Sequence, residues 1–176
     1  MEDSQAALIE GARKFDRHVL EQIYDAYSPA LYRYAYRLLG RQDVAEEVLS
    51  ETFIRFLEAL QKGKGPKQHL RAYLYRIVHN ICTDTYRRQL PVEDPLEDDI
   101  EDRGLSSPQE SAEDAIELQN IRASLFRLTP DQRQVIVLRF FEGWDNDEVA
   151  AVLDKPVGAV KALQHRALAS LKRMVV

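Results

Sequence analysis

The sequence has a single cysteine, Cys82, and no apolar segment that approaches the length of a membrane span. One cysteine excludes a framework of intrachain disulfides and favours a reducing compartment. The first fifteen residues, MEDSQAALIEGARKF, contain no apolar run of signal-peptide length. We therefore expect a cytoplasmic protein that does not insert into a membrane.

Metal ligands and catalytic groups are also sparse. His79 and Cys82 could place two ligands on one helical turn, but His18, His69 and His165 provide no second ligand pair of recognisable spacing. Paired inward carboxylates, a nucleophile beside a base and a phosphate-cradling glycine loop are missing as well. We expect no metal, no cofactor, no catalytic residue and no enzymatic activity.

The charge is unevenly distributed. The chain has a net charge of −5, which taken alone argues against a nucleic-acid partner. Residues 89–116, however, hold ten acidic residues and one base, Arg103, so the remaining residues together carry +4. Residues 61–88 contain seven lysines and arginines against one acid, Asp84. This distribution favours nucleic-acid binding by the front half of the chain.

The spacing of apolar residues predicts an all-α protein of two small helical domains joined by a flexible acidic linker. The expected division is a short polar extension (1–14), a first domain (15–88), the linker (89–115) and a second domain (116–176). Pro29 predicts a kink or a break between two helices. Gly40 predicts the end of the helical stretch that contains Pro29. Asp43 and Glu46 predict a capping box at the start of the next helix, whose expected apolar side includes Leu57.

The stretch from Leu70 to Arg88 is the most informative. It predicts an amphipathic helix whose second face carries rings and cations toward solvent: Arg71, Tyr75, Arg76, His79, Tyr86, Arg87 and Arg88. Aromatic rings beside arginines suit an unpaired nucleic-acid strand, because each stacked base contributes about 1–3 kcal/mol. The alternative is that the rings pack on a neighbouring helix or at a domain rim. A mobile basic loop, 62–69, precedes the helix and carries Lys62, Lys64 and Lys67.

The C-terminal part predicts a helix-turn-helix. Thr129 with Gln132 and Asp145 with Glu148 form two capping boxes, and Gly143 ends the helix between them. The first of these helices should bury Val135, Ile136, Leu138, Phe140 and Phe141. The last helix, from Val157 to about Arg173, presents small and basic residues on one side, where Arg166 could bind guanine in the major groove. An antiparallel helical hairpin with a solvated basic face is the alternative.

The order and spacing of several strings resemble the extracytoplasmic-function sigma factors of bacterial RNA polymerase. The strings are LYRYAYRLLG, DVAEEVLSETFIRFLEAL, RAYLYRIVHNICTDTYRR, LTPDQRQVIVLRFFEGW and DEVAAVLDKPVGAVKALQHRAL. The resemblance implies a helical region 2 domain, a linker in place of region 3 and a helical region 4 domain. It also implies a sigma factor that directs core polymerase to promoters and helps to melt the minus-10 element.

The resemblance further implies roles for individual residues. Glu47, Ser50 and Glu51 match the helix that docks on the β′ clamp coiled coil, and the acidic residues Asp43 and Glu46 extend that face. The loop 62–69 matches the segment that captures a flipped minus-10 base, and Asn80 lies near the melted strand. The expected minus-35 readers are Lys161, Ala162, His165, Arg166 and Arg173. Alanines at 159 and 162 and a leucine at 163 replace polar residues frequent in the family, so readout should depend on Arg166, Lys161 and DNA shape.

The resemblance also implies partners. These are core polymerase, through the β′ clamp and the β flap, promoter DNA and an anti-sigma factor; we expect a monomer when the protein is free. The chain's acidity should prevent tight DNA binding without polymerase, since affinity depends on phosphate neutralisation. The competing hypothesis is an autonomous helix-turn-helix regulator, which predicts a stable dimer and a palindromic site.

Overall fold

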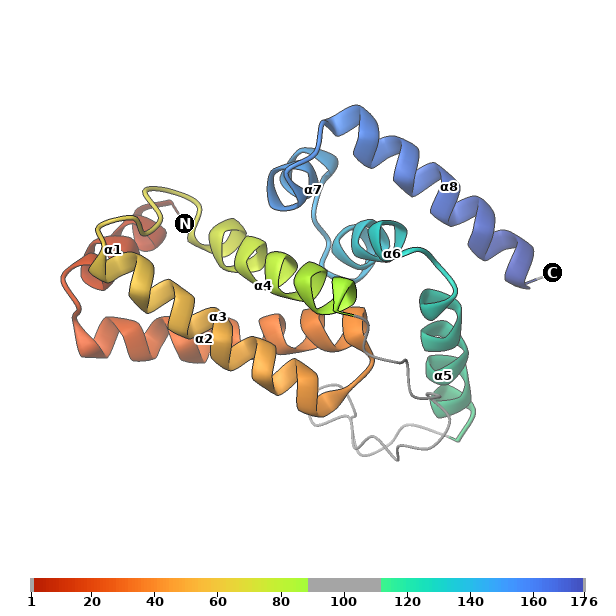
Figure 1. The fold of residues 1–176 in the computed structure, drawn as a ribbon, viewed down its shortest axis with the longest axis horizontal. Helices are drawn as coiled ribbons and strands as arrows, with labels where there is room; N and C mark the ends of the chain where they lie inside the picture. The colour runs from red at the N-terminus through yellow and green to blue at the C-terminus, as the bar shows by residue number, and fades with distance from the viewer. Residues whose placement is uncertain (1, 89–111, 176) are drawn as a thin grey trace.

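The computed structural model describes residues 2–88 and 112–175, and within these ranges it contains helices and no strand (Figure 1). The all-α prediction is confirmed. Most of the predicted linker, 89–111, lies outside the described residues. The helices are α1 (Glu2–Arg13), α2 (Arg17–Leu39), α3 (Gln42–Gln61), α4 (Leu70–Arg87), α5 (Ala112–Phe126), α6 (Pro130–Ile136), the π-helix η1 (Val137–Phe141), α7 (Asn146–Leu153) and α8 (Val157–Val175).

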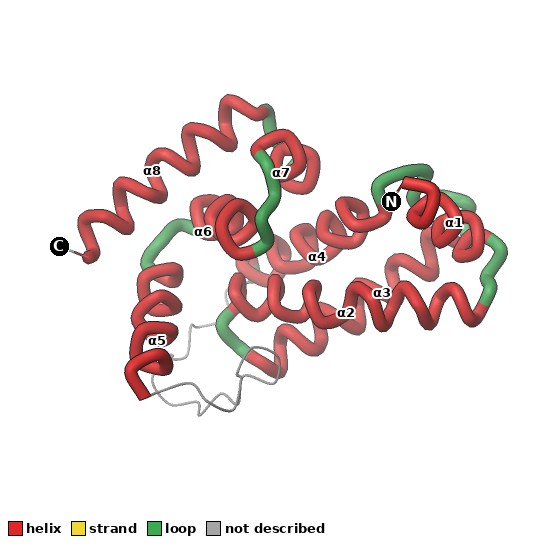
Figure 2. The backbone as a smooth tube through the Cα atoms, turned by 180° about the vertical axis from the view of Figure 1, so that it is seen from behind, coloured by secondary structure: helices red, strands yellow, loops and turns green. Residues whose placement is uncertain are grey.

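Helices α1 to α4 form one bundle, in which α2 and α3 lie side by side, α4 packs on both and α1 covers one end (Figures 1 and 2). Leu31, Phe56 and Leu74 are buried where the three longer helices meet. The stretch 1–14, which the sequence predicts as a short polar extension, contains a helix that packs on this bundle. Helix α1 is three turns long, because Ile9 and Ala12 provide an apolar face that is buried in the bundle.

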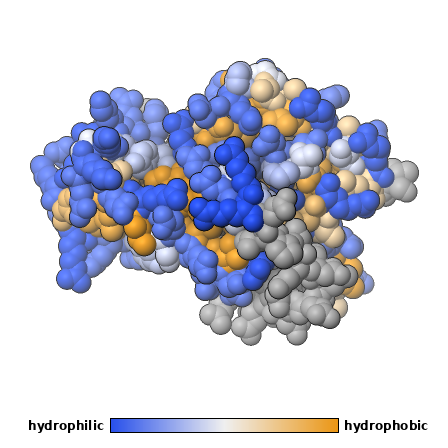
Figure 3. All heavy atoms as spheres, in the orientation of Figure 1, coloured by the Kyte–Doolittle hydropathy of each residue, from blue (hydrophilic) through white to orange (hydrophobic). Residues whose placement is uncertain are grey.

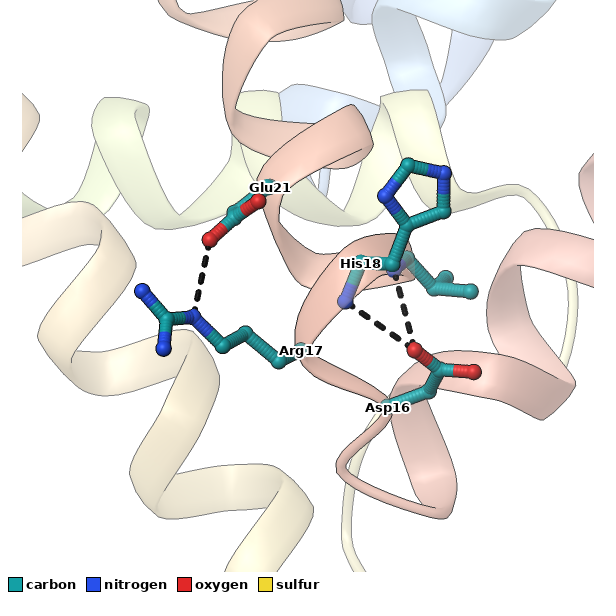
Figure 4. A network of polar contacts seen from close by, with 5 residues as sticks. Asp16, Arg17, His18 and Glu21 are labelled. Carbon is teal, nitrogen blue, oxygen red and sulfur yellow. Dashed lines mark hydrogen bonds and ion pairs between the residues drawn. The ribbon is translucent and has the colours of Figure 1, made fainter.

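Helix α2 begins at a local cap. The Oδ1 atom of Asp16 accepts hydrogen bonds from the backbone N–H groups of His18 (3.0 Å) and Val19 (3.4 Å), and Arg17 donates to Glu21 at 2.9 Å (Figure 4). The helix then continues through Pro29. Of the two predicted outcomes, a kink or a break between two helices, the break is therefore wrong. Pro29 is exposed, and at an exposed site water can satisfy the carbonyl that proline leaves unpaired.

Gly40 ends α2 as predicted. Its backbone is left-handed, with φ 71°, and its N–H donates to the carbonyl of Tyr36 at 2.8 Å. The predicted capping role of Asp43 is wrong, since α3 begins at Gln42 with Arg41 in the cap position. Arg41 instead binds the Asp43 carboxylate at 2.9 Å, and this hydrogen bond lowers the pKa of Asp43.

Replacing Gly40 by alanine is expected to destabilise the protein. A Cβ at this position would lie 2.5 Å from the Cζ atom of Phe126 in α5. A left-handed conformation also costs an alanine about 1–2 kcal/mol. Urea denaturation should therefore show a loss of at least that size. Gly63 has φ 67°, and a Cβ added there would have no atom within 4 Å, so Gly63→Ala measures the conformational cost alone. An equal loss of unfolding free energy in both variants would contradict the contact between position 40 and Phe126.

The two predicted capping boxes of the C-terminal part are confirmed. Thr129 and Gln132 exchange hydrogen bonds of 3.3 and 3.2 Å, and Asp145 and Glu148 exchange two of 2.8 Å. Between them α6 widens into η1, which shifts the side chains that follow. As a result Phe140 is 55% exposed and Phe141 is also exposed, contrary to the predicted burial.

The two halves of the chain pack directly against each other. Helix α4 contacts α7, while α2 contacts α6 and η1, and both figures show α7 beside α4 (Figures 1 and 2). Tyr75 of the first half and Trp144 of the second belong to one continuous buried cluster. Among the described residues no helix is both long and apolar enough to traverse a bilayer.

Candidate nucleic-acid interface

The ring-bearing face of α4 is covered by the second half of the chain. Tyr75 is fully buried and His79 is 9% exposed, so the prediction that these rings point to solvent is wrong. The Tyr75 ring lies between Tyr34 and Trp144, with centroid distances of 5.1 and 4.8 Å. Its hydroxyl donates to the Oε2 atom of Glu142 at 2.8 Å. The alternative, in which the rings pack on neighbouring elements, describes Tyr75 correctly.

His79 contributes no positive charge to this face. Burial lowers the pKa of His79, which keeps the imidazole neutral at pH 7; Asp131 opposes the shift, while Lys155 and Arg76 reinforce it. The Nδ1 atom of His79 is buried and has no hydrogen-bond partner among the described residues. The expected role of His79 as an exposed ring therefore requires the two halves to separate.

Tyr86 is half-buried at the C-terminal end of α4. Its hydroxyl donates to the carbonyl of Leu38 and accepts a hydrogen bond from Arg133. Burial raises the pKa of Tyr86 to about 12, against the opposing effect of the Arg133 charge. Tyr86 thus links α4 to α2 and α6, and the prediction of an exposed ring is wrong here too.

The arginines of α4 remain at the surface, but two of them contact the second half. Arg71 lies 4.3 Å over the Trp144 ring and 5.7 Å over the Tyr75 ring. Arg76 donates to the backbone carbonyl of Ala151 in α7. Three further predicted residues are exposed: Asn80, Arg87 and Arg88.

The basic loop between α3 and α4 is held at its middle. Pro66 is buried, and its carbonyl accepts a hydrogen bond from Arg13 of α1 at 3.2 Å. Its three lysines, Lys62, Lys64 and Lys67, are all exposed. The loop therefore presents three cations on an anchored segment at the N-terminal end of α4.

The outer face of α8 is open to solvent. Five predicted minus-35 residues are exposed there: Lys161, Ala162, His165, Arg166 and Arg173. Val160 and Ala167 on the opposite side are fully buried, and α8 packs on α6 and α7. Asp154, with φ 52°, makes the turn between α7 and α8. This is the helix-turn-helix that the sequence predicts.

The acidic face of α3 is also exposed. Asp43, Glu46, Glu47 and Ser50 face solvent, while Glu51 is half-exposed and paired with Arg55 at 2.8 Å. Ile54 and Leu57 are exposed further along α3, and Figure 3 shows apolar surface over α2 and α3. The expected burial of Leu57 is wrong. Together these residues form a surface that is acidic at one end and apolar at the other.

Sequence reasoning missed the residues that cover Tyr75. Glu142 and Trp144, which contact Tyr75, carried no expected role. Arg133, which binds Tyr86, carried none either. The one signal was Trp144, the chain's only tryptophan, placed directly after the helix-ending Gly143. Among the described residues no group of three histidine, cysteine, aspartate or glutamate side chains could hold a metal ion.

Comparison with known proteins accounts for this arrangement of a helical bundle followed by a helix-turn-helix. The family model described as "Sigma-70 region 2" matches residues 23–90, and the one described as "Sigma-70, region 4" matches residues 118–171. Both regions belong to the sigma-70 class of proteins. This chain belongs to the sigma-70 family, in its extracytoplasmic-function group.

Among its relatives, the sigma factor BldN of Streptomyces coelicolor is 30% identical over 96% of this chain. The match covers 64% of BldN, so this chain spans less than two thirds of that protein. SigX of Bacillus subtilis is 29% identical over 86% of this chain and 80% of its own. The structure of CnrH in complex with the cytosolic domain of CnrY matches 97% of this chain and 96% of that chain, with a TM-score of 0.74 and 25% identity. RpoE of Bartonella quintana, in complex with the anti-sigma factor NepR, shares the fold: its TM-score is 0.70 at 21% identity, over 88% of this chain and 95% of that chain.

Proposed function

We propose that this protein directs core RNA polymerase to specific promoters and helps to melt the minus-10 region during transcription initiation. The observation that carries the proposal is the exposed basic face of α8 within a helix-turn-helix, together with a separate exposed basic loop at 62–69. The first surface suits a duplex major groove, and the second suits the phosphates of an opened strand. The protein performs no catalytic step itself and works in the cytoplasm.

The acidic face of α3 is the proposed docking site for the β′ clamp coiled coil. Asp43, Glu46, Glu47 and Ser50 are exposed, and Glu51 lies beside them with its partner Arg55. An acidic patch steers a basic partner and accelerates association. The second domain would contact the β flap. The proposed division is 15–88, with α1 packed on it, for the polymerase and minus-10 domain and 116–176 for the minus-35 domain, with 89–115 as the connection.

The minus-10 surface is proposed to comprise the loop lysines and one face of α4. Lys62, Lys64 and Lys67 are exposed in this structure, as are Arg71, Arg76, Asn80, Arg87 and Arg88. Tyr75, His79 and Tyr86 can reach a strand only when the second half moves away. An anti-sigma factor is a proposed partner, because the structures of the similar proteins CnrH and RpoE were determined with CnrY and NepR.

Transcription in vitro with purified core polymerase tests the proposal. On a library of promoter fragments, the protein should select a subset with related minus-35 and minus-10 elements. Core polymerase alone should show no such selection. A stable dimer that bound a palindromic site tightly without polymerase would instead support the autonomous regulator.

Replacing Arg166 by alanine is expected to weaken upstream recognition. A bidentate bond from arginine to guanine is worth about 1–3 kcal/mol, so binding of the holoenzyme to the preferred minus-35 sequence should fall by about tenfold or more. Competition between preferred and altered minus-35 fragments measures the effect. Lys172→Ala, an exposed residue of the same helix, is the matched control. An equal loss of affinity for every upstream sequence would show that Arg166 contacts a phosphate and not a base.

A further inference from the structure

The basic loop 62–69 begins by folding back on the end of α3. The backbone N–H of Lys64 donates to the carbonyl of Ala59 at 2.8 Å. A Cβ added at Gly65 would lie 2.6 Å from the Cδ2 atom of Leu60, so the absence of a side chain at Gly65 permits this close passage. The loop is therefore fixed against α3 as far as Gly65.

Beyond Gly65 the loop is held by α1, and Figure 1 shows the two side by side. The Nη2 atom of Arg13 donates to the carbonyl of Pro66 at 3.2 Å, and Pro66 is buried. Proline has no backbone N–H, so its carbonyl is the one main-chain group through which a hydrogen bond can hold it. A charged donor makes the stronger kind of hydrogen bond. Arg13 thus ties the last turn of α1 to the middle of the loop.

Helix α1 is itself firmly packed. Ile9 and Ala12 are buried in the bundle, and α1 contacts both α2 and α3. A Cβ added at Gly11 would lie 2.6 Å from the Cγ2 atom of Val19, so α1 and α2 meet closely at this glycine. The backbone from which Arg13 extends is therefore fixed by its neighbours, and the hydrogen bond to the loop starts from a rigid base.

Two lysines flank the anchored proline. Lys64 lies two residues before Pro66 and Lys67 directly after it, and both lysines are exposed. An unpaired nucleotide within a strand has a phosphate on each side, and lysine binds phosphate as a point charge. A loop that is already held in its binding conformation loses less conformational entropy when the strand binds. Fixing Pro66 therefore lowers the cost of bringing both lysines to one strand.

We propose that Arg13 is a positioning residue of the minus-10 surface, which acts through the Pro66 carbonyl to hold Lys64 and Lys67 in place before an unpaired strand arrives. The inference rests on the proposed function for its consequence, because that function assigns the loop to the opened strand. In this role Arg13 itself contacts no DNA. Helix α1, in a stretch that the sequence predicts as a polar extension, supports the loop.

Three variants separate the hydrogen bond from the charge. Arg13→Met keeps a long side chain and removes its donors, whereas Arg13→Lys retains a positive charge and three donors. Lys14→Met is the matched control, since Lys14 is the next residue, is exposed and pairs with Glu10 at 3.2 Å. This control removes one positive charge beside the anchor. Circular dichroism and urea denaturation verify that each variant is folded.

Proteolysis of the intact protein measures the anchor without DNA. A lysine-specific endoproteinase should cut after Lys64 and Lys67 severalfold faster in Arg13→Met than in the wild type, because cleavage requires local opening of the loop. Mass spectrometry locates the cuts. Arg13→Lys and Lys14→Met should be cut at close to the wild-type rate. Unchanged cleavage in a folded Arg13→Met variant, or an equal acceleration in Lys14→Met, would overturn the anchor.

Promoter melting by the holoenzyme provides the second measurement. Once initial binding is saturated, Arg13→Met should lower the equilibrium constant for melting about three- to tenfold, the range that one hydrogen bond contributes. Arg13→Lys should restore most of this loss, and Lys14→Met should melt the promoter normally. Permanganate reactivity of the minus-10 thymines reports the melted fraction.

The double variant Lys64→Ala/Lys67→Ala tests the proposed function by itself. Impaired melting in this double variant together with normal melting in Arg13→Met would overturn the positioning role and leave the proposed function of the loop intact. Normal melting in the double variant would contradict the part of the loop in the proposed function, and with it the positioning role of Arg13. Impaired melting in both, with rescue by Arg13→Lys, supports the proposal.

Discussion

Replacing Tyr75 by alanine is expected to lower the free energy of unfolding by about 3–5 kcal/mol, the usual cost of removing a buried aromatic ring. Tyr75 is among the largest fully buried side chains, and its ring contacts Tyr34 and Trp144. The change would leave a cavity between the two halves and an unpartnered Glu142 oxygen. Urea denaturation followed by circular dichroism measures the loss. Tyr75→Phe retains the ring, so it should lose only about 1 kcal/mol through the missing hydroxyl bond.

The same position has a separate functional expectation. In holoenzyme on promoter DNA, Tyr75→Leu keeps an apolar side chain but provides no ring for a base, so promoter melting should decrease more than initial binding. Permanganate reactivity of the minus-10 thymines reports melting, and a filter assay at low temperature reports initial binding. Tyr75→Phe is the control and should melt normally. Normal promoter melting with Tyr75→Leu would contradict the assignment of Tyr75 to the proposed minus-10 surface.

Replacing Arg133 by methionine is expected to cost about 3–5 kcal/mol. Arg133 as a whole is 4% exposed. Its guanidinium donates to the carbonyls of Leu38 (2.7 Å), Leu125 (2.9 Å), Phe126 (3.3 Å) and Leu128 (3.3 Å). Methionine fills the space but removes the guanidinium donor from these four carbonyls near the ends of α2 and α5. The Leu38 carbonyl keeps the Tyr86 hydroxyl as a donor, and the Leu125 carbonyl keeps the backbone N–H of Leu128. Denaturation in urea should show the loss. The loss should be smaller in Arg133→Lys, which retains three donors.

The matched control for Arg133 is Arg127. It lies in the same region but its side chain is exposed, so Arg127→Met should change the free energy of unfolding by less than about 0.5 kcal/mol. Equal small losses in Arg133→Met and Arg127→Met would show that the buried guanidinium does not hold the two halves together.

Local patterns in the sequence predicted the elements that depend on local chemistry. The capping boxes at Thr129 and Asp145 and the helix end at Gly40 need only a few neighbouring residues, and all three are present. The amphipathic pattern of residues 70–88 likewise predicted α4. The exposure predicted for the rings of α4 failed because the surroundings of these rings come from distant residues. Two local patterns also failed, and one of them is the predicted cap at Asp43, since α3 begins at Gln42. Phe140 and Phe141 became exposed because η1 changed the helical period, which the apolar pattern did not signal.

Periodicity and capping residues were sufficient to predict most of the helices and the helix-turn-helix, because these depend on short stretches of sequence. The family resemblance came from the order and spacing of five strings along the chain. Periodicity could also show that Tyr75 and His79 lie opposite the stripe that packs inside the bundle. It could not show that Trp144 and Glu142, about seventy residues away, cover that second face. The burial of Tyr75 is a property of the packing between α4 and the second half, and only the tertiary structure decides which surfaces meet there.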